Sequence, residues 1–307
     1  MRTGIVVGSR GSRLALIQAE SVAAKFKEIN PHLEVSIARI VTEGDRNRHI
    51  PLERVAGAGI FVKKLEEALI EGRIDIAVHS LKDVPTEVPD GLRLLAVTER
   101  LDPRDVQVSR AGGLDELAPG SRIGTGSLRR AAQLTQYRPD LKACGIRGNV
   151  DTRLRMVSSG QVDGVIVAAA ALLRLGWEDR IAQYLPLPHF LPAVGQGALV
   201  VEARLDDKEV AGLVLPINHP PTRHSIVAER AFLRALGGGC RAPIAALGTL
   251  NGTILRLDGM IASVSGEKVL YASEEGSAVS PEEVGVRLAQ KLLRMGASDF
   301  IAEARLK

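Results

Sequence analysis

The sequence has few cysteines and few aromatic residues, and both shortages exclude classes of protein. Its 307 residues include two cysteines, Cys144 and Cys240, which are too few for a disulfide framework or a four-thiolate zinc site. Aromatic residues make up 3%, which argues against a single-strand nucleic-acid binder that works by base stacking. No apolar run approaches the roughly 20 residues of a membrane-spanning helix. We therefore expect a protein of a reducing, cytoplasmic compartment.

A strong charge of one sign is also lacking. Forty Lys and Arg residues against 36 Asp and Glu give a formal net charge of +4, so the location of the arginines matters more than their number. Hydrophobic residues at 45% and charged residues at 25% are ordinary for a globular protein and exclude intrinsic disorder. At roughly 100–200 residues per domain, the length predicts two or three domains.

Short apolar runs alternate with helical patterns through the first two thirds of the chain. The expected strands cover residues 5–7, 35–41, 74–78, 92–97, 122–124, 141–146, 162–168 and 199–203. Continuously apolar strands separated by helices predict an α/β fold whose sheets are covered on both faces. The late strand at 199–203 can return to the first domain. Residues 43–59 are polar and aperiodic, which indicates a long loop.

Helix signals stand at two places near the N-terminus and at the end of the chain. Ser12 is the expected N-cap of a first helix, and Phe61 opens an apolar helical face with Val62, Leu65, Ala68 and Leu69. The last third predicts a helix at 221–236, strands at 244–249, 254–263 and 268–272, and a final helix after 280. That helix should carry a capping box and a stripe that ends at Met295. This part reads as a small α+β domain.

Three loops share one design, in which a predicted strand ends and a predicted helix begins. They cover residues 8–12, 124–130 and 147–153, and they carry five arginines: Arg10, Arg129, Arg130, Arg147 and Arg153. A helix N-terminus attracts anions and repels an arginine. Repeated arginines there favour an anionic ligand, bound bidentately as carboxylate or phosphate. The alternative for any one of them is an ordinary surface salt bridge.

Two further residues are candidates for chemistry. Asp83 follows the buried strand that ends at His79, where α/β sheets place ligands and catalytic groups, although a turn aspartate is the plainer interpretation. His79 itself is expected to be a packed structural histidine. Cys240 follows three glycines that leave its thiol accessible, and Arg241 favours the thiolate. The alternative, a small buried apolar cysteine, suits Cys144 better.

These residues fall in segments whose order and spacing resemble the porphobilinogen deaminase family along essentially the whole chain. The matching segments are 9–15, 59–63, 79–85, 102–105, 124–130, 147–153, 191–197, 228–230 and 238–240. The resemblance implies two doubly wound domains like the lobes of periplasmic binding proteins, plus a small C-terminal α+β domain. The implied boundaries are 1–98 with 198–216, 103–193, and 220–307, the last carrying the cofactor cysteine.

The resemblance also implies an activity, a cofactor and a setting. Four porphobilinogen molecules would condense head to tail with loss of four ammonia, giving the linear tetrapyrrole hydroxymethylbilane. The product would be built on a covalent dipyrromethane held by a thioether to Cys240. The implied enzyme is a cytoplasmic, monomeric transferase without a metal, a nucleic-acid partner or a membrane partner. Each pyrrole carries an acetate and a propionate, which suits a cleft rich in arginine.

Residue roles follow from the same resemblance. Asp83 would be the catalytic aspartate that stabilises the cation formed as ammonia leaves. The implied cofactor contacts are Cys240, Lys82, Asp83, Thr125, Ser127, Arg129, Arg130, Arg147 and Gly148. The implied substrate contacts are Arg10, Ser12, Phe61, Arg147, Arg153, Arg174 and Gln196. Residues 43–59 would be the lid.

Three departures from the family pattern and three rival functions stay open. Ala58 stands where many relatives have lysine, Gly126 where they have serine, and Ala242 where they often have a β-branched residue. The main rival is a non-catalytic, two-lobed polyanion-binding protein, which would need neither Asp83 nor Cys240. A nucleic-acid binder should show binding that weakens steeply with salt. A cysteine hydrolase lacks a visible base partner.

Overall fold

The computed structural model describes residues 2–41, 62–237 and 242–306. Their contacts divide the chain into two compact units. The first unit comprises Met1–Leu101 and Ala198–Arg223, and the second comprises Asp102–Gly197 and His224–Lys307. The chain therefore leaves the first unit once and returns to it before it ends in the second.

The first unit is built on a five-stranded sheet with the order β2-β1-β3-β10-β4. The strands are β1 (Gly4–Arg10), β2 (Glu34–Ile40), β3 (Ile76–Ser80), β4 (Leu92–Val97) and β10 (Leu199–Arg204). β1 runs parallel to β2 and β3, whereas β10 is antiparallel to β3 and β4. The late strand thus returns to the first sheet, as the sequence predicted. β1 is longer than expected and includes Gly8 to Arg10, which the sequence analysis assigned to a loop.

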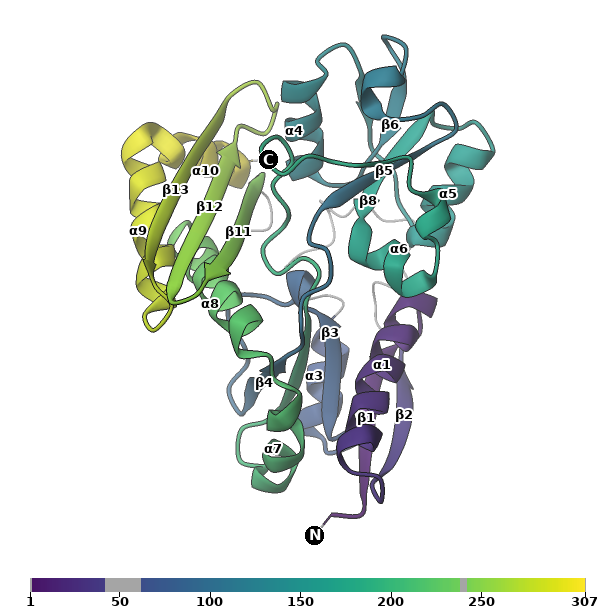
Figure 1. The fold of residues 1–307 in the computed structure, drawn as a ribbon, viewed down its shortest axis with the longest axis vertical. Helices are drawn as coiled ribbons and strands as arrows, with labels where there is room; N and C mark the ends of the chain where they lie inside the picture. Colours follow the sequence, from purple (N-terminus) through teal and green to yellow (C-terminus); the bar gives the residue numbers. More distant parts are fainter. Residues whose placement is uncertain (1, 42–61, 238–241, 307) are drawn as a thin grey trace. The chain divides into compact units, whose positions relative to one another are not determined.

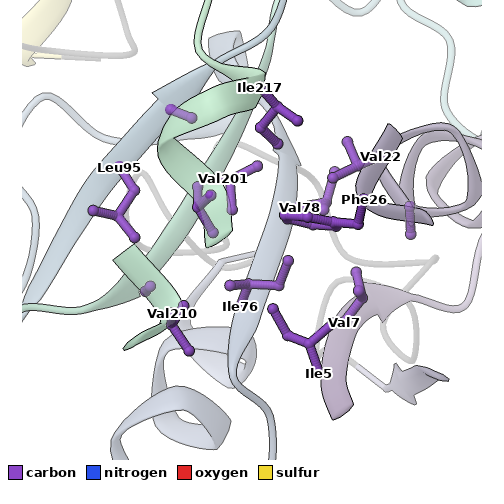
Figure 2. Packing of buried hydrophobic residues seen from close by; sticks show 14 of the residues in the cluster. Ile5, Val7, Val22, Phe26, Ile76, Val78, Leu95, Val201, Val210 and Ile217 are labelled. Atoms are coloured by element: carbon purple, nitrogen blue, oxygen red, sulfur yellow. The ribbon is translucent and has the colours of Figure 1, made fainter. Parts of the chain in front are cut away.

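Both faces of this sheet are covered, as the apolar strands predicted. The helices are α1 (Arg13–Ile29), α3 (Lys63–Ile70) and α7 (Lys208–Val214). Val22 and Phe26 of α1 pack over Val78, on one face of β3 (Figure 2). Leu65 and other residues of α3 pack with Ala77, the neighbour of Val78. Successive residues of a strand point to opposite faces, so one strand serves two cores.

The second unit contains another five-stranded sheet, with the order β7-β6-β8-β5-β9. The strands are β5 (Asp105–Ser109), β6 (Arg122–Gly124), β7 (Lys142–Cys144), β8 (Gly164–Ala168) and β9 (Gln183–Tyr184). Its helices are α4 (Leu128–Tyr137), α5 (Val150–Ser158) and α6 (Ala169–Leu175). Ile166 of β8 packs with α4, while its neighbours Val165 and Val167 pack with α5 and α6. The doubly wound arrangement is therefore present in both units.

The sequence analysis missed β5, for a physical reason. β5 alternates Val106 and Val108 with the polar residues Asp105 and Gln107. Such alternation is typical of a half-exposed strand, whereas the predicted strands were recognised as continuous apolar runs. In the fold all four residues are buried, and β5 lies between β8 and β9. Asp105 is buried with charged and polar partners from other segments, whereas Nε2 and Oε1 of Gln107 have no hydrogen-bond partner among the described residues.

A three-stranded antiparallel sheet completes the second unit (Figure 1). It consists of β11 (Ile244–Asn251), β12 (Ile254–Ala262) and β13 (Val269–Ser277). The accompanying helices are α8 (Pro220–Ala235), α9 (Pro281–Leu292) and α10 (Ser298–Leu306). Phe232 and Leu288 fill the core between these helices and the sheet. Ala132 of α4 packs against the opposite side, so this small sheet joins the same unit as β5 to β9.

The end of the chain departs from the sequence prediction in two ways. The side chain of Ser280 makes no capping hydrogen bond to α9, so the predicted capping box is wrong. Met295 is 47% exposed and does not continue the apolar stripe. Gly296 has φ = 101° inside a π-helical segment, Leu293–Ala297, and this left-handed residue ends the helical periodicity before α10.

Short 3₁₀ turns connect several elements. They are Leu81–Asp83, Leu114–Glu116, Glu178–Arg180 and Leu215–Ile217. None of the helices in the described ranges is long and apolar enough to cross a membrane. Within the same ranges, no cluster of three or more His, Cys, Asp or Glu residues could hold a metal ion.

Candidate functional site

The first unit contains a pocket at the carboxyl ends of β1 and β3. Its lining combines a guanidinium, two hydroxyls, an imidazole and a carboxylate with apolar walls. The lining residues are Arg10, Ser12, Leu14, Ala15, Gln18, Val62, Val78, His79, Ser80 and Asp83. Three residues that the sequence singled out for ligand contact, Arg10, Ser12 and Asp83, thus come together. The parallel strands β1 and β3 bring them to one edge of the sheet.

Ser12 stands where β1 turns into α1, and it is the helix N-cap as predicted. Its Oγ accepts a hydrogen bond from the Ala15 amide at 3.3 Å. The hydroxyl hydrogen of Ser12 is not used by that bond, so it can still donate to an acceptor in the pocket. On the same side, Gln18 Nε2 donates to Ser80 Oγ at 2.9 Å and ties α1 to the end of β3.

Asp83 ends the 3₁₀ turn that follows β3. The turn is anchored by Leu81, which is buried and whose amide donates to the Ala198 carbonyl at 3.1 Å. Asp83 itself is exposed, and its carboxylate makes no hydrogen bond or ion pair within the part of the chain that the structure describes. Asp83 lies in a turn, as the plainer interpretation expected, but its side chain does not cap the turn, which is closed by the bond from the Val84 amide to the Leu81 carbonyl. Its carboxylate is available to a ligand.

A buried acid–base pair lies behind this pocket. His79 Nε2 is 3.0 Å from Glu202 Oε2 of β10, and both side chains are almost fully buried. His79 is packed into the structure, as expected. Glu66 of α3 is half-buried, and this burial together with the charge of Glu202 raises its pKa to about 7, while the charge of His79 opposes the shift. The α3 side of this sheet therefore holds titratable groups beside a pocket with a free carboxylate.

In the second unit, the loop between β6 and α4 places Thr125, Ser127, Arg129 and Arg130. Ser127 is the N-cap of α4, and its Oγ accepts from the Arg130 amide at 3.4 Å. Thr125 Oγ1 accepts from the Ser127 amide at 3.2 Å. The loop has the predicted strand-to-cap design. The arginines in the first turn of α4 are nevertheless only 6% exposed each.

Both arginines converge on Asp105, a residue to which the sequence analysis gave no role. Arg129 Nη1 is 2.7 Å from Asp105 Oδ2, and Arg130 Nη2 is 2.7 Å from Oδ1. Burial alone raises the pKa of Asp105, but the charges and hydrogen bonds of the two guanidiniums hold it well below its ordinary value. The only sequence signal for Asp105 was its place at the end of the 102–105 segment.

The loop between β7 and α5 supplies Arg147, Gly148 and Arg153. Asn149 caps α5, because its Oδ1 accepts a hydrogen bond from the Thr152 amide at 3.0 Å. Gly148 has φ = 106°, and a Cβ there would lie 2.7 Å from the side chain of Thr152, so glycine is required on both counts. Arg153 Nε donates to the Gly148 carbonyl at 2.9 Å, which holds its guanidinium against this loop. Arg147 is half-buried.

Arg174 and Gln196 belong to the same unit but are placed differently. Arg174 Nη2 donates to the Gly197 carbonyl at 2.8 Å, and burial lowers the pKa of its guanidinium to about 10. Gln196 is fully buried, and its Nε2 donates to Asp105 Oδ1 and to the Pro103 carbonyl, each at 2.8 Å. Substrate contact by Gln196 stays a prediction; its observed partners are protein groups.

Two family models match this chain. "Porphobilinogen deaminase, dipyromethane cofactor binding domain" matches residues 5–212, and "Porphobilinogen deaminase, C-terminal domain" matches residues 224–294. The chain belongs to the porphobilinogen deaminase family.

Curated family members resemble it over nearly their whole length. The porphobilinogen deaminase of Pelobacter propionicus is 49% identical over 97% of this chain and 96% of that protein. That of Geobacter metallireducens is 48% identical over 97% and 93%, and that of Pelotomaculum thermopropionicum 46% over 99% and 98%. Among solved structures, the methionine-binding protein MetQ is similar at 16% identity and a TM-score of 0.43, over 70% of this chain and 89% of that one.

Several residues that the family resemblance implicates lie outside the described part of the chain. These are Phe61, Cys240, Ala58 and the expected lid at 43–59. Cys144, by contrast, is half-buried at the end of β7 and packs against the core that Val165 and Leu172 share. This placement agrees with the interpretation of Cys144 as a small apolar residue rather than a reactive thiol.

Proposed function

We propose that this chain condenses four porphobilinogen molecules head to tail, with release of four ammonia, to give hydroxymethylbilane. This makes it a transferase of porphyrin and haem biosynthesis. The observation that carries the proposal is the match of two porphobilinogen deaminase models to residues 5–212 and 224–294. The full-length relatives of that name support it, because their identity spans all the segments that hold the candidate residues.

The family model across the first 212 residues is named for a dipyrromethane cofactor, and the residues present fit such a group. Its pyrrole rings carry acetate and propionate side chains, so it needs several hydrogen-bond donors and surplus positive charge. Arg129 and Arg130 share one carboxylate, and Nε and Nη2 of Arg129 make no hydrogen bond within the described ranges. When bound, the group supplies the pyrrole end to which substrate units are added.

The proposed holding residues are the ones that the family resemblance implies. Thr125, Ser127, Arg129, Arg130, Arg147 and Gly148 would bind its carboxylates together with Lys82 and Asp83. Cys240 would hold it covalently through a thioether. Cys240 is favoured over Cys144 because Cys144 packs against a hydrophobic core. Arg10, Ser12, Phe61, Arg147, Arg153, Arg174 and Gln196 would bind the carboxylates and ring of the incoming substrate.

Asp83 is the proposed catalytic residue. As the C–N bond of the substrate's protonated aminomethyl group breaks, the electron pair of that bond leaves with the nitrogen as ammonia, and a positive charge develops on the pyrrole. The described residues leave the Asp83 carboxylate without a hydrogen bond or ion pair. It can therefore accept a hydrogen bond from the pyrrole N–H and stabilise the positive charge. A C–C bond then forms, and a ring proton must leave to restore aromaticity. In this proposal the same carboxylate accepts that proton.

The remaining parts of the proposal concern setting and organisation. The enzyme would act in the cytoplasm as a monomer on a small molecule, without a nucleic-acid or membrane partner. It would have three domains, at 1–98 with 198–216, at 103–193 and at 220–307. The return of β10 to the first sheet supports the discontinuous first domain. The rival function, a two-lobed polyanion-binding protein, does not use the free carboxylate of Asp83.

Intact mass of the purified protein tests the proposal. Two deaminated substrate units should add about 420 Da as a covalent adduct, present in the wild type and in Cys144→Ser but absent from Cys240→Ser. If the wild type carries no adduct, porphobilinogen is added to the apo-protein. An adduct that then forms supports the proposal. A mass that stays unchanged would favour the binding protein.

A further inference from the structure

We infer that Asp105 is a positioning residue, which holds Arg129 and Arg130 in a fixed direction toward the carboxylates of the ligand. The inference rests on the proposed function, because the ligand is the carboxylate-bearing chain of that site. Asp105 does not itself touch the ligand in this proposal. It acts through the two arginines.

The hydrogen bonds around Asp105 use both of its oxygens. Oδ2 accepts from Arg129 Nη1 at 2.7 Å. Oδ1 accepts from Arg130 Nε at 3.1 Å, from Arg130 Nη2 at 2.7 Å and from Gln196 Nε2 at 2.8 Å. Asp105 is 0% exposed. A carboxylate with four donors and no solvent contact cannot rotate without losing several bonds, so it is a rigid anchor.

The cluster carries more positive than negative charge. Asp105 contributes one negative charge, and Arg129 and Arg130 contribute two positive charges, so the sum is +1. Asp105 is the single carboxylate that bonds either arginine within residues 2–41, 62–237 and 242–306. A surplus charge that is more than nine-tenths buried is unfavourable unless an anion meets it. The cluster is therefore prepared for an anionic group rather than balanced without one.

The two arginines are held on different edges. Arg130 uses Nε and Nη2 for Asp105 and Nη1 for the Ile166 carbonyl at 3.2 Å. Arg129 uses only Nη1, for Asp105 and for the Leu191 carbonyl at 2.6 Å. Nε and Nη2 of Arg129 form an edge that makes no hydrogen bond within the described residues. Asp105 thus fixes the direction in which that edge points.

A second layer holds the anchor in place. Asp105 is the first residue of β5, and its carbonyl accepts from the Leu185 amide at 2.9 Å. Gln196 is fastened in turn, because the preceding Gly195 amide donates to the buried carboxylate of Glu229 at 2.8 Å. A site that must recognise charged groups gains from such fixed support, because the donors need not reorganise when the ligand arrives.

Asp105→Asn tests the inference in apo-protein made without porphobilinogen, with two readouts. The first is the rate at which the adduct forms after porphobilinogen is added, followed by intact mass. The second is the rise in melting temperature caused by citrate, a tricarboxylate probe. It is measured in the Cys240→Ser background, which cannot form the thioether. We expect the adduct to form at least 10-fold more slowly and the citrate shift to fall by half or more.

A larger citrate-induced rise in melting temperature in Asp105→Asn than in its parent would overturn the inference. If Asp105 only balances charge, its removal leaves +2, and citrate should stabilise Asp105→Asn more than the parent. A larger citrate shift, or an adduct formed at the wild-type rate, contradicts positioning. If the wild type gains no mass from porphobilinogen, the proposed function fails, and the citrate readout alone then decides the role of Asp105.

The chain offers a matched control in the first unit. Asp75 also bonds two arginines, Arg2 and Arg204, but it does not line the pocket. Asp75→Asn should lower the melting temperature while leaving adduct formation and the citrate shift unchanged. If Asp105→Asn fails to fold, Gln196→Met removes one donor from Asp105 without a change of charge. It should slow adduct formation about threefold, and a wild-type rate with a wild-type citrate shift would overturn the inference.

Discussion

Asp83 and Asp105 are both aspartates near the end of an inner strand of a five-stranded sheet, yet their surroundings are opposite. Asp83 is exposed and makes no hydrogen bond within the described ranges, while Asp105 is fully buried with four donors. A carboxylate that reacts must be free to meet its substrate. A carboxylate that positions other groups must be saturated and immobile. In the proposed function, Asp83 carries out the chemistry and Asp105 supports the arginines that hold the ligand.

The loops that carry the arginines show the same contrast. Two of the three loops contain a Gly-Ser pair whose serine caps a helix, at Ser12 in the first unit and Ser127 in the second; in the third loop Asn149 is the cap. Arg10 precedes its cap and lines an open pocket, whereas Arg129 and Arg130 follow theirs and are buried. Arg153 also follows its cap, Asn149, but is only partly buried, so the ion pairs with Asp105, rather than the position relative to the cap, distinguish Arg129 and Arg130.

The largest expected effect is on turnover, from Asp83→Ala. Removing the free carboxylate should lower kcat about 100-fold or more, since acid–base groups contribute roughly that much. The free energy of unfolding should stay within about 0.5 kcal/mol of wild type, because an exposed side chain without bonds is lost. Ammonia release and urea denaturation measure the two quantities. Asp90→Ala, also exposed in this unit, is the control and should change neither; near-normal turnover in Asp83→Ala would break the comparison.

Asp105→Asn, unlike Asp83→Ala, should strongly lower the free energy of unfolding. Leaving two buried guanidiniums without their carboxylate should cost about 3–5 kcal/mol of unfolding free energy at pH 7. Because the folded-state pKa of Asp105 is depressed, its contribution is present above the ordinary value near 4 and is lost as the pH falls toward the folded-state pKa. The gap between wild type and variant, measured by urea denaturation, should therefore narrow in acid. A gap below 1 kcal/mol at pH 7 would refute the anchor.

The glycines before the two caps sharpen the comparison of the loops. A Cβ at Gly126 would lie 2.7 Å from the Ile146 carbonyl oxygen, whereas one at Gly11 would meet nothing within 4 Å. Gly126→Ser should therefore lower the unfolding free energy by about 1–3 kcal/mol, and Gly11→Ser, the control, by much less. Thermal denaturation of both variants measures this. Equal effects would show that the second loop is no tighter than the first.

The smallest expected effect concerns Glu66, in the first unit. Its pKa is raised to about 7, mainly by burial and also by the charges of Glu202 and Glu67. The charges of His79 and Lys63 oppose this shift. An acid with a raised pKa favours the fold while protonated, so its contribution is lost between about pH 4.5 and pH 7 as the pH rises. Glu66→Gln should melt a few degrees above wild type at pH 8 and close to it at pH 4.5.

The control for Glu66 lies on the same helix. Glu67 pairs with Lys64 at 2.6 Å, and that bond lowers its pKa. Glu67→Gln should show no gain in melting temperature at pH 8. If both variants melt alike at every pH, the environment of Glu66 has no special effect, and the acid–base pair behind the pocket does not influence stability through it.

Much of the fold could be read from local patterns. The strands at 92–97 and 122–124 have the predicted bounds, and Ser12 caps α1 as expected. Asp83 was singled out as a candidate because it follows an apolar strand, a signal within a few residues of the chain, and it lines the pocket. Such features depend on neighbouring residues, and neighbouring residues are visible in a sequence.

The features that were missed depend on distant residues. β5 went unrecognised because Asp105 and Gln107 are polar, and their burial has no local explanation. Asp105 is inside because Arg129, Arg130 and Gln196 reach it from two other segments of the chain. The break at Gly296 and the unused capping position at Ser280 likewise depend on how the last helices pack.

The sequence by itself determined the alternation of strands and helices, the family, and the candidate residues for carboxylate binding and catalysis. The tertiary structure decided which of those residues are open and which are buried. Arg10 and Asp83 share a pocket, while Arg129 and Arg130 are directed by Asp105. The physical reason is that a charge can be buried only where an opposite charge reaches it, and in this protein the opposite charge comes from another part of the chain.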